Sequence, residues 1–143
     1  MRVVHLNTII PGKLYQRGQF VTFPWSAKMQ VLDKYDIGMV VNLWARPDPE
    51  LHTRQGLIYI HWPIGGGEPP KNYHYMTDMI ENYMRSGVKV LVHCEAGVNR
   101  SIWLVARLLA AYEQIDGSQA LQRVSEAVGR VKVRQGLVTE LAS

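Results

Sequence analysis

The length, composition and charge of the chain exclude several classes of protein. Its 143 residues, of which 47% are hydrophobic and 20% charged, suffice for one globular domain, and we expect that domain to span residues 1–143 without a separate regulatory one. The longest apolar runs fall far short of a membrane span, and polar residues interrupt the N-terminus too soon for a secretory signal. The net charge of +4 favours anionic ligands, although the basic residues are scattered and form no dense block.

Strands and helices are predicted to alternate along the chain. In chain order we expect strands over 3–10 and 13–17, a helix over 22–35, strands over 39–44 and 57–62, a helix over 72–85, a strand over 88–92, and helices over 100–114 and 118–128, followed by a short final helix. Strands that alternate with crossover helices favour a mainly parallel sheet with helices on both faces. We therefore expect a single-domain α/β fold.

A few residues are expected to mark the ends of these elements. The Pro-Gly pair at 11–12 separates the first two strands, which form a hairpin or two short independent strands. Thr22 is predicted to cap the first helix, with Pro24 in its first turn. Gly87 is predicted to end the helix over 72–85. Asp116 is predicted to begin the cap of the helix that runs to 128.

The chain has a single cysteine, Cys94, and five histidines. One cysteine excludes an internal disulfide bond, which suits a reducing compartment, and we expect a cytoplasmic protein. The histidines outside the Cys94 segment lack the spacing of metal ligands, so no metal site is predicted.

The most informative segment, His93 to Ser101, reads H-C-E-A-G-V-N-R-S. It lies between the apolar run 88–92 and an apolar helical stretch, which predicts a loop between a strand and a helix. Because such a loop ends where a helix begins, its backbone N–H groups can converge on one point, and the helix dipole adds positive potential there. The segment therefore predicts an anion-binding loop whose curvature suits phosphate or another oxyanion.

Two side chains of this segment are placed to do chemistry on a bound phosphate. Five residues separate Cys94 from Arg100, enough for the thiol and the guanidinium to face one oxyanion from different sides. Arginine offers two parallel hydrogen bonds to phosphate oxygens, and the loop amides with the helix N-terminus favour a thiolate nucleophile. Ser101 is placed to donate its hydroxyl to the sulfur, and His93 to orient the loop through a backbone hydrogen bond.

With these residues, the segment resembles the H-C-x5-R-[ST] signature of cysteine-dependent protein tyrosine and dual-specificity phosphatases. The Ala-Gly pair after Cys94-Glu95 is similar to the commoner dual-specificity form. The resemblance implies that Cys94 is the nucleophile, Arg100 the transition-state clamp and Ser101 a hydroxyl helper. It also implies that the phosphate cradle is formed by the backbone amides of Glu95, Ala96, Gly97, Val98, Asn99 and Arg100.

Outside this segment the resemblance is carried by shorter stretches. Residues 12–19, G-K-L-Y-Q-R-G-Q, are similar to the "lyR-[SG]-gq" opening of many small dual-specificity phosphatases, and residues 41–43 resemble their "vinL" strand. The family's fold is the mainly parallel α/β sheet described above. Its reaction is hydrolysis of phosphate monoesters on protein through a phosphocysteine intermediate, without a metal or other cofactor.

Residues 61–70, H-W-P-I-G-G-G-E-P-P, depart from the family pattern. In the family, the corresponding loop carries an aspartic acid shortly after the proline, which protonates the leaving oxygen, and here that position is Gly65 or Gly66. Three consecutive glycines are expected to make the loop very mobile. Glu68 is the nearest carboxyl and the predicted general acid, provided that it is protonated at working pH. Asp48, in a proline-rich turn, is a second candidate of lower rank.

Three functions stay open at this point. The first is a phosphatase of phosphorylated proteins, acting on phosphotyrosine and also on phosphoserine or phosphothreonine. The second is an RNA 5'-triphosphatase of the same superfamily, which Asn99 before the arginine favours, while Ala96 and the lack of a dense basic surface make nucleic acid a less favoured partner. The third is a pseudophosphatase that binds phosphorylated partners without turnover. The intact Cys94 and Arg100 favour an active enzyme, and no membrane association is expected.

Overall fold

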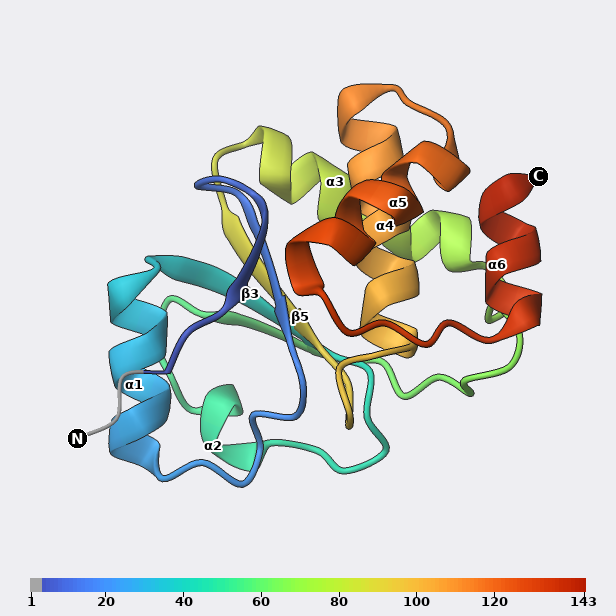
Figure 1. Cartoon of the computed structure of the whole chain (residues 1–143). Coiled ribbons are helices and arrows are strands. Elements are labelled where there is room, and N and C mark those ends of the chain that lie inside the picture. Colours follow the sequence, from blue (N-terminus) through green and yellow to red (C-terminus); the bar gives the residue numbers. More distant parts are fainter. Residues whose placement is uncertain (1–3) are drawn as a thin grey trace.

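The computed structural model describes residues 4–143 and contains one five-stranded sheet between two layers of helices (Figure 1). The strands stand in the order β1-β2-β5-β3-β4. Their bounds are β1 Asn7–Ile10, β2 Leu14–Arg17, β3 Ile37–Asn42, β4 Ile58–His61 and β5 Lys89–His93. β1 pairs with β2 as an antiparallel hairpin, whereas β2, β5, β3 and β4 run parallel. The predicted mainly parallel α/β sheet is therefore confirmed.

Helices cover both faces of this sheet, as Figure 1 shows. Their bounds are α1 Trp25–Lys34, α2 Pro49–His52, α3 Tyr73–Arg85, α4 Arg100–Glu113, α5 Gly117–Val128 and α6 Gln135–Ala142. α1 and α2 pack on one face, and the other four helices lie on the opposite face. Within residues 4–143, no helix combines the length and the hydrophobicity that crossing a bilayer would take.

The two central strands and α4 explain the longest apolar runs of the sequence. In β5, Val90 and Val92 pack in the α4 layer, while Leu91 packs in the α1 layer. A strand that is buried on both faces shows no alternation of polar and apolar residues. α4 is covered by the sheet and by α3, α5 and α6, so it too is apolar almost all round.

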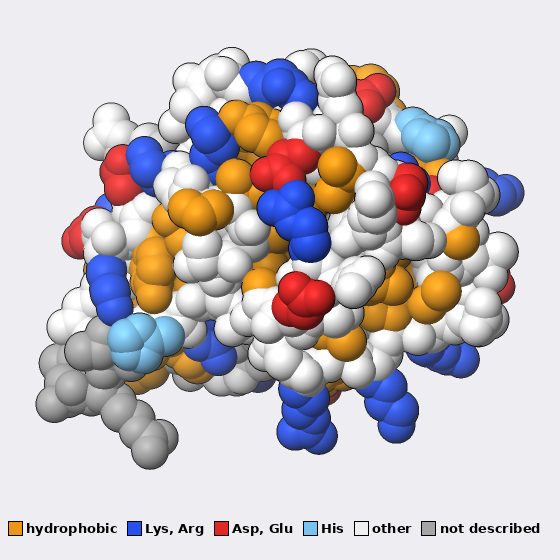
Figure 2. Space-filling view, turned by 45° about the horizontal axis from the view of Figure 1, so that its top comes forward, with side chains coloured by type: hydrophobic (Ala, Val, Ile, Leu, Met, Phe, Trp, Pro, Cys, Tyr) orange, Lys and Arg blue, Asp and Glu red, His pale blue; other side chains and the backbone are white. Residues whose placement is uncertain are grey.

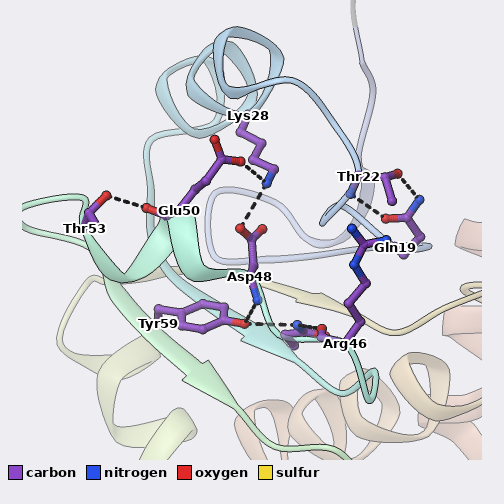
Figure 3. Close-up of polar contacts among 9 residues, drawn as sticks. Gln19, Thr22, Lys28, Arg46, Asp48, Glu50, Thr53 and Tyr59 are labelled. Carbon is purple, nitrogen blue, oxygen red and sulfur yellow. Dashed lines mark hydrogen bonds and ion pairs between the residues drawn. The ribbon is translucent and has the colours of Figure 1, made fainter.

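The cap predicted for the first helix is wrong. α1 begins after Pro24, and no side chain in the described part of the molecule caps it. The backbone N–H of Thr22 instead donates to the side-chain oxygen of Gln19 over 3.0 Å, and its hydroxyl accepts from the Gln19 amide (Figure 3). The Gln19 side chain offers both a donor and an acceptor, so it forms a local turn with Thr22. The Thr22 hydroxyl that was predicted to cap the helix is used in this turn.

Other boundaries differ from the prediction by a few residues. β3 ends at Asn42, because the side-chain oxygen of Asn42 accepts the Trp44 N–H over 2.9 Å and turns the chain. The first strand begins at Asn7, and the start predicted at Val3 lies outside the described residues. α2 forms where only a turn was expected. The predicted cap of α5 is confirmed, since the Asp116 carboxylate accepts a backbone N–H of the first turn over 2.8 Å.

One carboxylate of α6 joins it to two other helices. Glu140 accepts hydrogen bonds from Trp103 Nε1 at 2.7 Å and from the Tyr73 hydroxyl at 2.9 Å. Arg107 Nη2 lies 2.9 Å from the same side chain, which is largely buried. These contacts tie α6 to α3 and α4. The start of α6, at Gly136, lies beside Gly67 of the loop that follows β4.

Candidate active site

The Cys94 loop, residues 94–99, connects the end of β5 to the start of α4 at the carboxyl edge of the parallel strands. Cys94 is 2% exposed, and its Sγ lies 3.1 Å from Ser101 Oγ. The backbone N–H of Ser101, in the first turn of α4, donates to the same sulfur over 3.4 Å. The sulfur therefore lies at a helix N-terminus, where backbone dipoles favour negative charge.

The turn after β2 supports this loop from outside. Gly97 has a φ of +76°, which glycine adopts without strain, and a Cβ at this position would lie 2.5 Å from the backbone nitrogen of Gly18. Gln19 N–H donates to the Glu95 carbonyl over 2.8 Å. Because backbone meets backbone at Gly97, no larger residue fits there, and the loop keeps its tight curvature.

Three carbonyl groups of the loop are bound from outside. The pairs are Glu95 O with Gln19 N–H at 2.8 Å, Gly97 O with Gln16 Nε2 at 2.9 Å, and Val98 O with Lys132 N–H at 2.7 Å. In a trans peptide, the N–H of the next residue points opposite to the carbonyl. The N–H groups of residues 96, 98 and 99 therefore point away from these partners, as an anion-binding nest requires.

The Arg100 side chain is mostly buried and contacts both loops at this edge of the sheet. Its side chain is 19% exposed, and Nη1 makes a long contact of 3.4 Å with the carbonyl of Ile64 in the loop after β4. Nη2 lies 3.8 Å from the Glu95 carboxylate, a distance at which the ion pair is weak. The guanidinium thus contacts the loop after β4 and lies near the Cys94 loop, and within residues 4–143 it has no short ion pair.

His93 is fully buried beneath the loop. Its Nδ1 lies 3.4 Å from the Cys94 carbonyl, which is a weak hydrogen bond by geometry, so its predicted orienting role stays a prediction. Within residues 4–143, the other ring nitrogen has no hydrogen-bond partner. Burial lowers the pKa of His93 from its usual 6.5 to about 4, with a smaller contribution from the positive charge of Arg17. The imidazole is therefore neutral at neutral pH.

The glycine loop, residues 64–68, is packed against two other segments. Asn99 Nδ2 donates to the Gly66 carbonyl over 2.8 Å, while the Arg134 N–H donates to Asn99 Oδ1 over 2.9 Å. A Cβ on Gly66 would lie 2.8 Å from Asn99 Nδ2, and a Cβ on Gly136 would lie 2.1 Å from the carbonyl of Gly67. Gly66, one of the glycines predicted to give mobility, thus also allows close contact with the Cys94 loop, while Gly136 allows close contact between this loop and the start of α6.

The two carboxyl candidates for the general acid have different surroundings. Glu68 is exposed, and its Oε1 lies beside Gly136 in the first turn of α6. Among the described residues, no hydrogen bond or ion pair joins Glu68 to Cys94 or Arg100. The structure therefore brings Cys94 and Ser101 into contact, with Arg100 at the start of the same helix, and it places Glu68 beside the first turn of α6. The role of Glu68 as the acid stays a prediction.

Asp48 is a buried anchor of the loop after β3. Its carboxylate lies 3.0 Å from Lys28 Nζ, and both side chains are almost completely buried (Figure 3). Glu50 contacts the same ammonium at 2.7 Å. The backbone N–H of Asp48 donates to the Tyr59 hydroxyl over 2.8 Å. These contacts stabilise the turn, which agrees with the lower rank of Asp48 as an acid candidate.

The prediction from sequence missed the roles of two polar residues. Gln16 is fully buried in β2, where its amide contacts the Cys94 loop, and Asn99 joins that loop to the glycine loop. A glutamine inside a short buried strand was the available sign for the first, because a buried amide needs partners. The partners themselves lie too far along the chain to be read from the sequence.

Comparison with known families decides the membership of the chain. The model of the dual-specificity phosphatase catalytic domain matches residues 20–143. The chain belongs to this family. The prediction of a cysteine-dependent protein tyrosine or dual-specificity phosphatase is thus confirmed at the level of the family.

Two related proteins carry names of the same kind. A tyrosine-protein phosphatase of Autographa californica nuclear polyhedrosis virus is 28% identical over 124 residues, which cover 82% of this chain and 74% of the viral protein. The tyrosine-protein phosphatase vhp-1 of Caenorhabditis elegans is 26% identical over 99 residues, or 67% of this chain. The matched region spans only 15% of the worm protein.

Solved structures confirm the predicted fold. Human DUSP28 has a TM-score of 0.77 at 18% identity, with 95% of this chain and 89% of that chain covered. The human tyrosine phosphatase-like serine/threonine/tyrosine-interacting protein has a TM-score of 0.76 at 22% identity, with 95% and 92% covered. PTPMT1 in complex with PI(5)P has a TM-score of 0.78 at 16% identity, with 96% and 92% covered. At these identities the likeness concerns the fold alone.

Proposed function

We propose that the chain is a phosphatase that hydrolyses phosphate monoesters on phosphorylated proteins through a phosphocysteine intermediate. One observation supports this proposal most strongly: Cys94 Sγ lies at the N-terminus of α4, within reach of both the hydroxyl and the backbone N–H of Ser101. Arg100 begins the same helix, and its guanidinium lies 3.8 Å from the carboxylate of Glu95 in the Cys94 loop. A nucleophile, a cationic clamp and a hydroxyl donor are therefore close to one anion-binding loop.

The proposed reaction has two steps. In the first, the Cys94 thiolate forms a bond to phosphorus while the bond to the tyrosine oxygen breaks, and Arg100 with the loop amides stabilises the charge on the equatorial oxygens. In the second, water attacks phosphorus, the P–S bond breaks, and its electron pair stays on the sulfur. The water supplies its oxygen and both hydrogens to the product, which leaves as dihydrogen phosphate.

The leaving group decides which substrates we expect. General acid catalysis contributes roughly a hundred- to ten-thousandfold, so an acid that is displaced or absent slows the expulsion of an alkoxide most. A phenol ionises near pH 10, far more easily than an alcohol, and therefore leaves more readily without a proton. Because glycine replaces the family's aspartic acid and Glu68 lies against α6, we propose phosphotyrosine as the preferred substrate over phosphoserine and phosphothreonine.

The test is hydrolysis of p-nitrophenyl phosphate and of a phosphotyrosine peptide by the wild-type chain and by Cys94→Ser. We expect turnover that vanadate blocks and that falls on the order of ten-thousandfold in the variant. Thr8→Ala, on the exposed side of β1, is a matched control that should keep the wild-type rate. Tight binding of phosphopeptide by the wild type without turnover would contradict the proposal and support a binding module.

A panel of substrates separates the remaining hypotheses about the preferred substrate. We expect the phosphotyrosine peptide to be hydrolysed faster than a phosphoserine peptide of the same sequence and faster than an RNA 5'-triphosphate. On the face that Figure 2 shows, Lys and Arg side chains are dispersed among uncharged and acidic groups, which offers little to an RNA backbone. A higher rate on the RNA 5'-triphosphate would overturn the choice of substrate while leaving the chemistry of Cys94 in place.

A further inference from the structure

The Cys94 site has a buried neighbour that the reaction described above does not use. Gln16 lies in β2, beside β5, and is completely buried. A buried amide costs free energy unless its polar atoms find partners, and each polar atom of this side chain has one. Nε2 donates to the Gly97 carbonyl over 2.9 Å and to Ser101 Oγ over 2.8 Å, while Oε1 accepts from Asn7 Nδ2 over 2.9 Å.

These partners determine which end of the Gln16 amide faces the active site. The Gly97 carbonyl can only accept a hydrogen bond, so the Gln16 atom 2.9 Å from it must be the nitrogen. The same nitrogen contacts Ser101 Oγ, and its two hydrogens are thus both used. Asn7 donates to the opposite end and keeps the amide from turning over.

The orientation of Gln16 fixes the direction of the Ser101 hydroxyl. Because Nε2 only donates, Ser101 Oγ must accept from it, and the hydroxyl hydrogen has to go elsewhere. Cys94 Sγ, 3.1 Å away, is the acceptor that the described residues offer. When Cys94 is a thiolate it has no hydrogen of its own, so the hydroxyl donates to the sulfur.

We propose that Gln16 is a positioning residue, which holds the Ser101 hydroxyl toward the Cys94 sulfur while the phosphocysteine is hydrolysed. The inference rests on the proposed function. In that step the P–S bond breaks, the electron pair moves to sulfur, and a hydroxyl that already points at the sulfur stabilises the developing thiolate without reorganisation. Gln16 lies outside residues 20–143, the range that the family model matches.

The first test is Gln16→Met, which keeps the length of the side chain and removes its donor. With p-nitrophenyl phosphate in a rapid-mixing experiment, we expect the first turnover to keep its rate and the steady-state kcat to fall about tenfold, the loss typical of one hydrogen bond to an ion. A burst of nitrophenol close to the enzyme concentration should therefore appear. kcat/KM should change little, because attack by Cys94 does not require the hydroxyl.

A double variant separates positioning from a merely structural role. Ser101→Ala should show the same burst and slow turnover, and adding Gln16→Met to it should cause no further loss of kcat. A loss in the Ser101→Ala background as large as in the wild type would overturn the proposal. So would a Gln16→Met enzyme whose kcat and kcat/KM fall together without a burst.

A second variant covers the case in which Gln16→Met does not fold. Asn7→Ala, on the partly exposed β1, frees the far end of the amide and should lower kcat a few-fold with a smaller burst, whereas Thr8→Ala should have no effect. An Asn7→Ala enzyme with unchanged kcat and no burst would contradict the inference. If the wild type itself fails to hydrolyse aryl phosphates, the proposed function falls first, and this inference falls with it.

Discussion

The Cys94 loop and the glycine loop contact the same guanidinium, yet they are built in opposite ways. In the Cys94 loop, the backbone is packed on Gly18, its carbonyls are bound from outside, and the reactive side chains lie on the loop itself or in the first turn of α4. The glycine loop contributes backbone, and its position depends on Asn99 and on the start of α6. The Cys94 loop and the helix turn after it contain the candidate reactive side chains, whereas the glycine loop is held in position by contacts with neighbouring segments.

This difference matters for the proposed reaction, because glycine stands where the resemblance to the family places the acid. Cys94, Arg100 and the loop amides all belong to the strand-loop-helix unit from β5 to α4, which does not include residues 64–68. Each prediction below changes one side of this comparison.

The largest expected effect concerns the Cys94 loop, through the buried His93 beneath it. Because its pKa is lowered to about 4 in the folded chain and is near 6.5 when unfolded, the unfolded state binds the additional proton between these values. The contribution of neutral His93 to the free energy of unfolding is complete above pH 6.5. It is lost as the pH falls toward 4, by about 3 kcal/mol in all. Urea unfolding at a series of pH values measures it.

Two variants isolate this contribution. His93→Gln should flatten the stability curve between pH 6.5 and 4, whereas replacing the exposed His5 by glutamine should leave its shape unchanged. A wild-type stability curve that does not fall between pH 6.5 and 4 would contradict this prediction. It would mean that a partner or a water stabilises the charged imidazole in the folded chain.

The second prediction concerns the exposed Glu68 of the glycine loop. If Glu68 moves over the phosphate and acts as the acid, Glu68→Gln lowers kcat on a phosphoserine peptide about a hundredfold and on p-nitrophenyl phosphate far less. The alkaline limb of the pH profile should also disappear, because an acid works only while it holds its proton. Glu126→Gln, on the exposed face of α5, is the control. Equal rates for both variants would remove Glu68 from the mechanism.

The smallest expected effect comes from the contact between the two loops. Asn99→Ala removes the hydrogen bonds to Gly66 and Arg134 and leaves the Cys94 backbone without a clash. We expect kcat/KM for a phosphotyrosine peptide to fall about tenfold, the effect of one or two lost hydrogen bonds, with a smaller change for p-nitrophenyl phosphate. Ser125→Ala, away from the site on α5, serves as the matched control. A fall of a hundredfold or more on both substrates would place Asn99 in the phosphate cradle as a side chain.

The prediction succeeded best where the determinants of structure are close in sequence. His93 to Ser101 combines a strand end, a glycine with positive φ and a helix start, so the loop follows from local rules. The Thr22 cap failed because Gln19, three residues earlier, competes for the same groups. The general acid could not be settled from sequence because three glycines impose no direction on the residue that follows them.

The amino-acid sequence alone determined the loop between β5 and α4 and the alternation of strands and helices, since neighbouring residues and apolar periodicity set these features. It also predicts Cys94 and Arg100 as the nucleophile and the clamp. Only the tertiary structure decided that Gln16 reaches Ser101, 85 residues further along the chain, and that Asn99 joins the loops after β4 and β5. The reason is physical: a hydrogen bond between distant segments depends on the register of the sheet and the packing of α4 and α6, which no local pattern encodes.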